Sequence, residues 1–382
     1  MRVANYAECM CLYPRKMINK KYTATEKNGG IIPELPIIGH DSEGNAVYDE
    51  RILYVQIPCG QCEECRATKA REWQVRLNEE IKDWKYIYFM TLTFAPKELE
   101  NLCNKYRLQE CNAVFANALR HALERYRKDH KKSLKHWFIT ELGHEGTERI
   151  HAHGLIFSNE VLEFSDPNEN KLRTWKYWKY GHVYVGDYVS NRTINYIVKY
   201  INKIDKDHKG FIGQILASPG LGKRWLESNY AKDYKYRGKQ TFDTYILPNG
   251  AEVKLPKYYK NHRYNENERE MIWRNYLDKE VTTISGTNYI DSQSEQNYSS
   301  IIKKAQEVNK FNGFGDDSKE WQKRQYNITR RMLQQVERNK RIKEMSEALH
   351  LGHYQKAAEM AEKEAKNMKF AKKVLKNLEI SK

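Results

Sequence analysis

The chain contains no apolar run long enough to span a membrane, and its first residues lack the apolar segment of a secretory signal peptide. These absences argue against a membrane protein and a membrane partner, and they predict a protein of the cytoplasm. Disulfides are rare in that reducing compartment, so the seven cysteines need another explanation.

A nucleotide-binding loop is also missing. The glycine-rich stretch S-P-G-L-G-K-R-W at 218–225 does not have the G-x4-G-K-[ST] spacing of a Walker loop. Acidic residues are in deficit, with 50 Asp+Glu against 66 Lys+Arg and a net charge of +16. This surplus suits a polyanion, nucleic acid before an anionic membrane, although a solvated basic surface would give the same count. The 27 tyrosines and 8 tryptophans add rings on which bases can stack.

Five of the cysteines lie in residues 1–68, which we expect to form a Cys-rich N-terminal segment. Three of them form the run P-C-G-Q-C-E-E-C, and the other two lie far upstream in C-M-C-L-Y-P. Thiolates at this tight spacing are typical of a structural zinc site, although the pattern is not that of a standard zinc finger. The predicted ligands are Cys59, Cys62 and Cys65 with one of Cys9 or Cys11, for which we take Cys11. Buried thiols are the competing interpretation.

A second pattern with the chemistry of a metal site is E-R-I-H-A-H-G-L-I-F at 148–157. As a strand it places His151 and His153 on one face, with apolar residues on the other. The preceding stretch L-K-H-W-F-I-T-E also has strand character, and glycines lie between the two. A hairpin centred near Gly146 would bring Glu141 opposite His151, giving a carboxylate and two imidazoles for a divalent ion. Mn²⁺ suits these ligands and Mg²⁺ is more abundant. The alternative is a half-buried strand whose histidines face solvent.

A third pattern is the helix predicted in T-I-N-Y-I-V-K-Y-I-N-K at 193–203. Its apolar stripe consists of isoleucines and a valine, whereas Tyr196, Lys199, Tyr200 and Lys203 fall on the opposite side. Buried structural tyrosines should share the apolar stripe, and these do not. A tyrosine hydroxyl can attack a phosphodiester when a cation polarises the phosphate and a nearby lysine favours the phenolate. The product is a covalent 5′-phosphotyrosine with a free 3′-hydroxyl, and the second tyrosine can attack while the first is still loaded.

The order of the predicted elements is strand, helix, strand, strand, which indicates an α+β domain with helices against a mostly antiparallel sheet. Helices are predicted near 66–82 and 112–128, and strands near 86–94 and 182–188. The residues after the Cys-rich segment, 69–265, are expected to form the main domain. A polar, linker-like segment follows at 266–318, and a charged helical tail at 319–382.

Several of these motifs together resemble a known family. In chain order, M-C-L-Y-P, P-C-G-Q-C-E-E-C, Y-F-M-T-L-T-F, I-H-A-H-G-L-I-F and Y-I-V-K-Y-I-N-K resemble the replication initiation protein of microvirus (gokushovirus-like) single-stranded DNA phages. These proteins belong to the HUH endonucleases of rolling-circle replication. The similarity covers roughly residues 9–260, and the sequence differs from the family in lacking the common proline before the histidine pair.

The resemblance implies a five-stranded antiparallel sheet with flanking helices. It implies that His151 and His153 bind the metal, that Glu141 is the acidic residue before them, and that Tyr196 and Tyr200 are paired nucleophiles, beside which we place Lys199 and Lys203 as catalytic cations. The expected activity is metal-dependent nicking and joining of single-stranded DNA at the phage origin, in the cytoplasm of a bacterial host and with host helicase and polymerase as partners.

Two other interpretations fit part of the pattern. A cupin-like metalloenzyme also carries H-x-H on a strand, but its Glu follows the pair and its chain is dominated by short strands. A basic, zinc-stabilised protein that binds or packages single-stranded DNA without catalysis would share the charge and the cysteines. Covalent attachment to DNA distinguishes this second alternative from the nicking enzyme.

Overall fold

The structure is a computed structural model that describes residues 11–22, 32–106, 110–143, 148–186, 188–205, 207–208, 211–278, 281–284, 287–290, 295–316, 318, 341, 344–364 and 375–378. The chain forms two compact units. The unit called here the cysteine unit comprises Met1–Asp83, Ile194–Ile204 and Gly220–Trp321, and the sheet unit comprises Trp84–Thr193, Asp205–Pro219 and Gln322–Lys382. The segment expected to be one domain, 69–265, therefore contributes to both, and each unit is described by itself.

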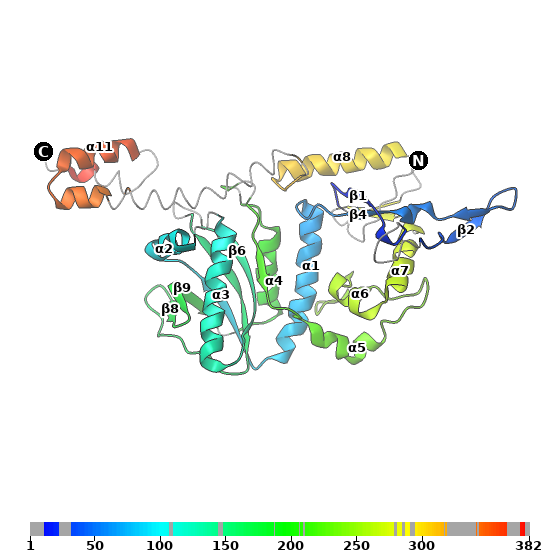
Figure 1. The fold of residues 1–382 in the computed structure, drawn as a ribbon, viewed down its shortest axis with the longest axis horizontal. Coiled ribbons are helices and arrows are strands. Elements are labelled where there is room, and N and C mark those ends of the chain that lie inside the picture. The colour runs from blue at the N-terminus through cyan, green and yellow to red at the C-terminus, as the bar shows by residue number, and fades with distance from the viewer. Residues whose placement is uncertain are drawn as a thin grey trace. The chain divides into compact units, whose positions relative to one another are not determined.

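The sheet unit contains most of the long strands, and Figure 1 labels its elements. They are β5 (Tyr86–Leu92), α2 (Pro96–Tyr106), α3 (Cys111–His130), β6 (Lys135–Leu142), β7 (Ile150–Ser158), β8 (Leu172–Trp175), β9 (Trp178–Gly186), β10 (Ile215–Ala217) and, near the C-terminus, α11 (Tyr354–Glu364). The predicted helix near 112–128 and the predicted strands near 86–94, 134–141 and 148–157 are confirmed.

The strands form one antiparallel sheet in the order β10-β6-β7-β5-β9-β8. The α+β class is confirmed, but the sheet has six strands where five were expected. The additional strand is β10, which pairs with the outer edge of β6 and is only three residues long. So short a strand carries no detectable alternation in the sequence. The register of β6 and β7 pairs Glu141 with His151, as the hairpin prediction required, while Gly146 itself lies outside the described residues.

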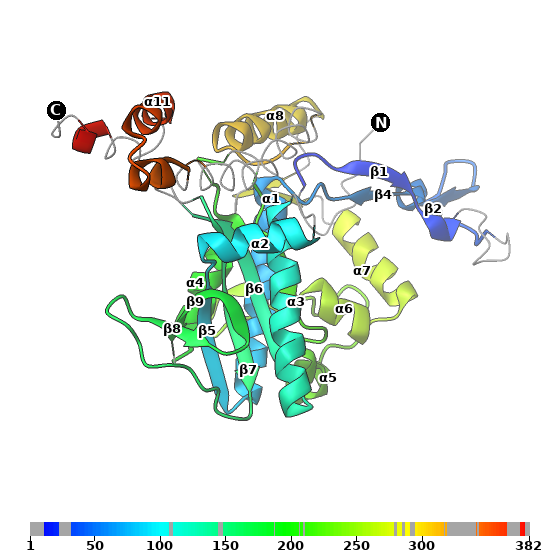
Figure 2. The ribbon, with the colours of Figure 1, turned by 60° about the vertical axis from the view of Figure 1, so that its left-hand side comes forward.

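Helices α2 and α3 cover one face of this sheet (Figure 2), and the main apolar core lies between them. Alternate residues of β7, such as Ala152 and Ile156, are fully buried in this core. Gly154 lies between them because a Cβ atom there would come within 2.3 Å of Cδ1 of Phe138 on β6. Since successive strand residues alternate in direction, His151 and His153 lie on the sheet face opposite α3.

The cysteine unit is built from short strands and several helices. Its elements are β1 (Arg15–Ile18), η1 (Lys20–Tyr22), β2 (Ile37–His40), β3 (Ala46–Tyr48), η3 (Glu50–Leu53), β4 (Tyr54–Ile57), α1 (Glu63–Glu80), η4 (Ile81–Asp83), η5 (Lys223–Glu227), α5 (Asn229–Lys232), β11 (Thr244–Ile246), β12 (Glu252–Lys254), α6 (Lys257–Arg263), α7 (Glu266–Asp278), β13 (Val281–Ile284), β14 (Thr287–Ile290) and α8 (Glu295–Phe311). Most of α4 (Asn191–Asn202) also belongs to it. The strands pair as two-stranded sheets, among them the hairpins β2–β3 and β11–β12.

The segment 266–318 differs from the expected linker, because it contains helix α7, the hairpin β13–β14 and helix α8. Its polar composition suggested a loop, but α8 presents Ile301, Ile302 and Ala305 to a buried cluster of the same unit. Much of the predicted helical tail, including 319–340, lies outside the described residues, and residues 344–350 and α11 are helical. Within the described part of the chain, no helix combines the length and the apolar character needed to cross a membrane.

Candidate metal centres and tyrosine pair

Glu141, His151 and His153 converge on the open face of the sheet. Oε2 of Glu141 lies 3.1 Å from Nε2 of His153 and 3.5 Å from Nε2 of His151. The two imidazole rings stand nearly perpendicular, with their centroids 5.1 Å apart. All three side chains are partly exposed, so an ion and a substrate oxygen can reach them from solvent. The pairing of β6 with β7 therefore assembles the predicted triad.

Both histidine rings are held from behind through Nδ1. In His153 this nitrogen lies 2.9 Å from the hydroxyl of Thr91, which is its cross-strand partner on β5. In His151 it lies 3.3 Å from the backbone carbonyl of Arg149. A ring that donates Nδ1–H to such a partner directs the lone pair of Nε2 the other way, which is here toward Glu141. Phe89 stacks on the His153 ring and limits its rotation further.

This geometry fits a divalent cation. The three ligand atoms lie within 4.8 Å of one another. Neighbouring ligands around an octahedral ion with bonds near 2.1 Å would be about 3 Å apart, close to the two measured separations. Two imidazoles and one carboxylate leave further coordination positions for water or phosphate oxygen. The triad can therefore hold a metal ion, while its ligands do not by themselves identify which one.

Tyr196 and Tyr200 form a pair on the polar face of α4. Their hydroxyl oxygens are 2.7 Å apart, and their rings meet edge to face with centroids separated by 5.5 Å. The apolar stripe of the helix, Ile194, Ile197, Val198 and Ile201, is buried as predicted. Tyr196 is 50% exposed, so its hydroxyl is accessible to a large substrate. A hydrogen bond between the two phenols couples their protons.

The two lysines of the same helix differ in their surroundings. Nζ of Lys203 lies over the ring of Tyr200, 5.6 Å from its centroid. Lys199 is exposed on the same turn, and its carbonyl accepts the backbone N–H of Lys203. The structure thus supports a role beside the tyrosines more directly for Lys203 than for Lys199. The tyrosine pair and the triad belong to different units, so each is an independent observation.

Cys11, Cys59, Cys62 and Cys65 form a second group of metal-ligating side chains. Cys62 caps α1 and Cys65 lies in its first turn, so the start of this helix fixes the direction of two thiols. Gly60 occupies the left-handed region, with φ of 76°, and turns the chain between Cys59 and Cys62. The structure contains these cysteines as free thiols, so the cluster is no disulfide. Cys9 lies outside the described residues.

The sulfur positions fit a tetrahedral ion. Sγ of Cys59 is 4.0 Å from Sγ of Cys65, and zinc–sulfur bonds of about 2.3 Å would place two sulfurs about 3.8 Å apart. Hydrogen bonds with the thiols of Cys11, Cys62 and Cys65, together with the backbone N–H of Gln61, hold the pKa of Cys59 well below its usual range. A cysteine that readily gives up its proton is a better metal ligand. The cluster can therefore also hold a metal ion.

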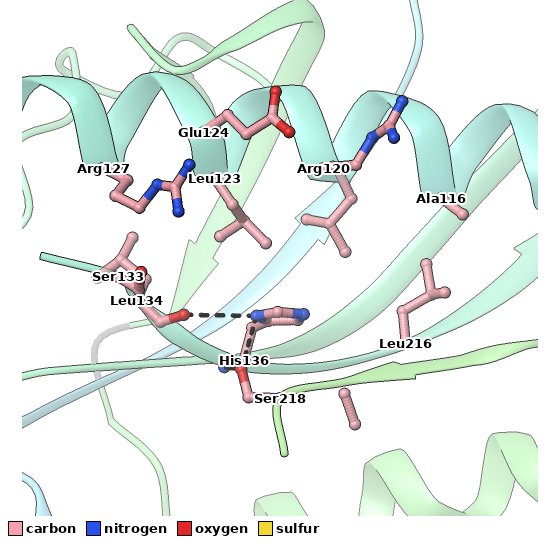
Figure 3. A pocket seen from close by; sticks show the side chains of 12 residues that line it. Ala116, Arg120, Leu123, Glu124, Arg127, Ser133, Leu134, His136, Leu216 and Ser218 are labelled. Atoms are coloured by element: carbon pink, nitrogen blue, oxygen red, sulfur yellow. Dashed lines mark hydrogen bonds between the residues drawn. The ribbon is translucent and has the colours of Figure 1, made fainter.

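A separate hollow of about 430 Å³ lies between α3 and the strands β6 and β10 (Figure 3). Arg120 and Arg127 line it from the helix, and His136 lies on the side of the strands. The ring of His136 lies between the Ser218 hydroxyl, at 2.9 Å, and the Leu134 carbonyl, at 3.5 Å. Burial lowers the pKa of this histidine and favours its neutral form. The hollow is on the α3 side of the sheet and is not part of the triad.

Sequence reasoning did not identify every residue of the site. Thr91 lies within the quoted motif T-L-T-F, but its contact with His153 depends on the pairing of β5 with β7. The carbonyl of Arg149 carries no side-chain signal. The buried group of Asp205, His208 and Glu148 was also missed, because these residues are far apart in the sequence and show no common pattern.

Part of the chain is shared with known replication proteins. Residues 87–205, which contain both the triad and the tyrosine pair, match the family described as replication-associated protein ORF2. The chain is also similar to the "Replication-associated protein VP4" of Bdellovibrio phage phiMH2K, with 28% identity over 261 residues that cover 62% of this chain and 78% of the relative. No solved structure matches the chain significantly.

Proposed function

We propose that this chain, a member of the replication-associated family that residues 87–205 match, initiates rolling-circle replication of a phage genome. It would nick single-stranded DNA at the origin and later rejoin the ends. The observation that carries the proposal is the convergence of Glu141, His151 and His153 within the matched segment. Tyr196 and Tyr200 lie in the same segment of the sequence, which supports their assignment as nucleophiles.

The triad would hold Mg²⁺ or Mn²⁺, which when bound supplies a Lewis acid for the scissile phosphate. The protein's own contribution is to keep the ligands in place before substrate arrives. Thr91 and the Arg149 carbonyl fix the two imidazole rings, and Phe89 restricts one of them. Such preorganisation lowers the cost of reaching the reactive arrangement.

The tyrosine hydroxyl would act as the nucleophile. Its oxygen attacks phosphorus and forms the 5′-phosphotyrosine bond, while the bond from phosphorus to the 3′ oxygen breaks. The leaving oxygen takes up a proton and becomes a free 3′-hydroxyl, and the phenol has given up its own proton. Within the pair, the hydrogen bond of 2.7 Å lets one phenol stabilise charge on the other, and Lys203 lies beside the ring of Tyr200. The reverse reaction rejoins DNA without ATP.

The four-cysteine cluster would hold a structural Zn²⁺. It links residues 11–13, the loop at 59–62 and the start of α1, and Ile301, Ile302 and Ala305 of α8 pack against the same cluster. A bound ion would thus tie together segments that are far apart in the chain, which is the usual contribution of such sites to folding.

The proposed partner is single-stranded DNA. The net charge of +16 supplies the electrostatic attraction, which acts without regard to sequence. Host helicase and polymerase would then extend the free 3′ end. These assignments rest on the proposed nicking activity.

The deciding experiment is a covalent-adduct assay. The full chain is incubated with Mn²⁺ and origin-derived single-stranded DNA that is labelled downstream of the nick, and the products are separated under denaturing conditions. We expect a protein–DNA adduct that survives denaturation, and peptide mass spectrometry should place it on Tyr196 or Tyr200. Binding of the DNA without any adduct would overturn the proposal and favour the non-catalytic DNA-binding protein.

A further inference from the structure

A completely buried histidine in the sheet unit has no role in the proposed chemistry. His208 is 0% exposed, and its Nδ1 lies 2.6 Å from Oδ2 of Asp205. The other oxygen of Asp205 accepts the backbone N–H of His208 at 2.8 Å. On the far side of the ring, Nε2 lies 3.6 Å from Oε1 of Glu148. The imidazole is therefore oriented by one carboxylate and faces a second.

Glu148 is held in a conformation that side chains disfavour. Its φ of 42° lies in the left-handed region, where Cβ is crowded by the backbone. A non-glycine residue stays there only when its surroundings hold it. Contact with the buried ring of His208 is one such restraint, because it fixes the carboxylate from inside the protein.

The residue that follows transmits this conformation to the triad. Nη1 of Arg149 donates to the carbonyl of Phe94 at 2.7 Å, which anchors the side chain. The carbonyl of Arg149 lies 3.3 Å from Nδ1 of His151. Its direction depends on the backbone between Glu148 and Ile150. Glu148 therefore influences which nitrogen of His151 carries the proton, and so whether Nε2 presents a lone pair to Glu141.

We infer that Asp205, His208 and Glu148 form a positioning clasp for His151. The clasp holds the chain before β7 in its left-handed turn, and the Arg149 carbonyl then selects the His151 tautomer that can bind a metal ion through Nε2. His208 is a positioning residue, since it acts through Glu148 and Arg149 and does not touch the triad. The metal-binding consequence rests on the proposed function, whereas the tautomer is a property of the protein alone.

Two measurements on the full chain test the clasp. Long-range ¹H–¹⁵N spectra of metal-free protein report which nitrogen of His151 is protonated, and Mn²⁺ titration followed by electron paramagnetic resonance reports affinity. In His208→Gln and in Glu148→Gln we expect the Nδ1–H tautomer of His151 to lose population and Mn²⁺ affinity to fall about tenfold. The matched control is His130→Gln, because His130 also faces a carboxylate, Glu160 at 3.7 Å, but lies on α3. It should change neither quantity.

A rescue variant separates positioning from general destabilisation. Glycine adopts the left-handed region without strain, so Glu148→Gly should regain part of the tautomer population that Glu148→Gln loses. If His208→Gln does not fold, the two Glu148 variants decide the matter. An unchanged His151 tautomer in folded Glu148→Gln, or no recovery in Glu148→Gly, would overturn the clasp. Failure of DNA nicking with the tautomer result intact would instead refute the proposed function alone.

Discussion

Replacing the paired tyrosines with phenylalanine tests the proposed chemistry most directly. Tyr196→Phe and Tyr200→Phe each keep the ring and remove one hydroxyl from a hydrogen bond of 2.7 Å. Such a bond contributes about 0.5–1.5 kcal/mol to stability, and the half-exposed position of Tyr196 places it at the lower end. The expected change in Tm is at most about 2–4 °C. Any large loss of activity then reflects chemistry and not unfolding.

The effects on activity follow from the helix. Residues four apart lie one turn from each other, with a rise of about 6 Å, so either hydroxyl can reach one phosphate after a modest shift of helix or DNA. Each single variant should therefore still cleave a short origin oligonucleotide and form an adduct. The double variant should form none. Repeated rounds on a circular template need one tyrosine to cut while the other holds the 5′ end, so both single variants should stop after the first round.

The assay is adduct formation on an oligonucleotide beside multi-round replication of a circle. The control is Tyr230→Phe, which removes a hydroxyl from a 79% exposed residue elsewhere in the same unit and should leave both activities intact. An adduct in the double variant would refute the assignment of these tyrosines. If one single variant forms no adduct and the other replicates through many rounds, the site has one nucleophile and one stacking tyrosine.

The remaining predictions concern the metal sites and the core. His151→Ala or His153→Ala should abolish nicking while gel-shift binding of single-stranded DNA persists, since binding uses basic and aromatic contacts; nicking by the double variant would exclude the metal role. Freshly purified, reduced protein should contain about one zinc per chain by atomic absorption, and Cys59→Ser should lose it; wild-type protein free of zinc would indicate buried thiols. Gly154→Ala should lower the free energy of urea unfolding by about 1–3 kcal/mol, because the new Cβ would lie 2.3 Å from Cδ1 of Phe138. A loss below about 0.5 kcal/mol would show that the strands separate easily.

Local patterns in the sequence predicted much of the candidate site. Alternation along 148–157 placed His151 and His153 on one face, and the turn length placed Glu141 opposite His151, as the sheet register confirms. Helical periodicity separated the tyrosines of α4 from its buried stripe. These features depend on neighbours within a few residues, whose spacing is fixed by strand and helix geometry.

Tertiary structure decided the features that join distant segments. The edge strand β10 exists because its three residues pair with β6, and 266–318 is partly helical because α8 buries apolar side chains against the cysteine cluster. Thr91 contacts His153 only because β5 lies beside β7, and His208 reaches Glu148 across 60 positions of sequence. A sequence shows which faces are apolar and which residues can ligate. It does not show which distant backbone meets them, because that choice is made by the packing of the whole core.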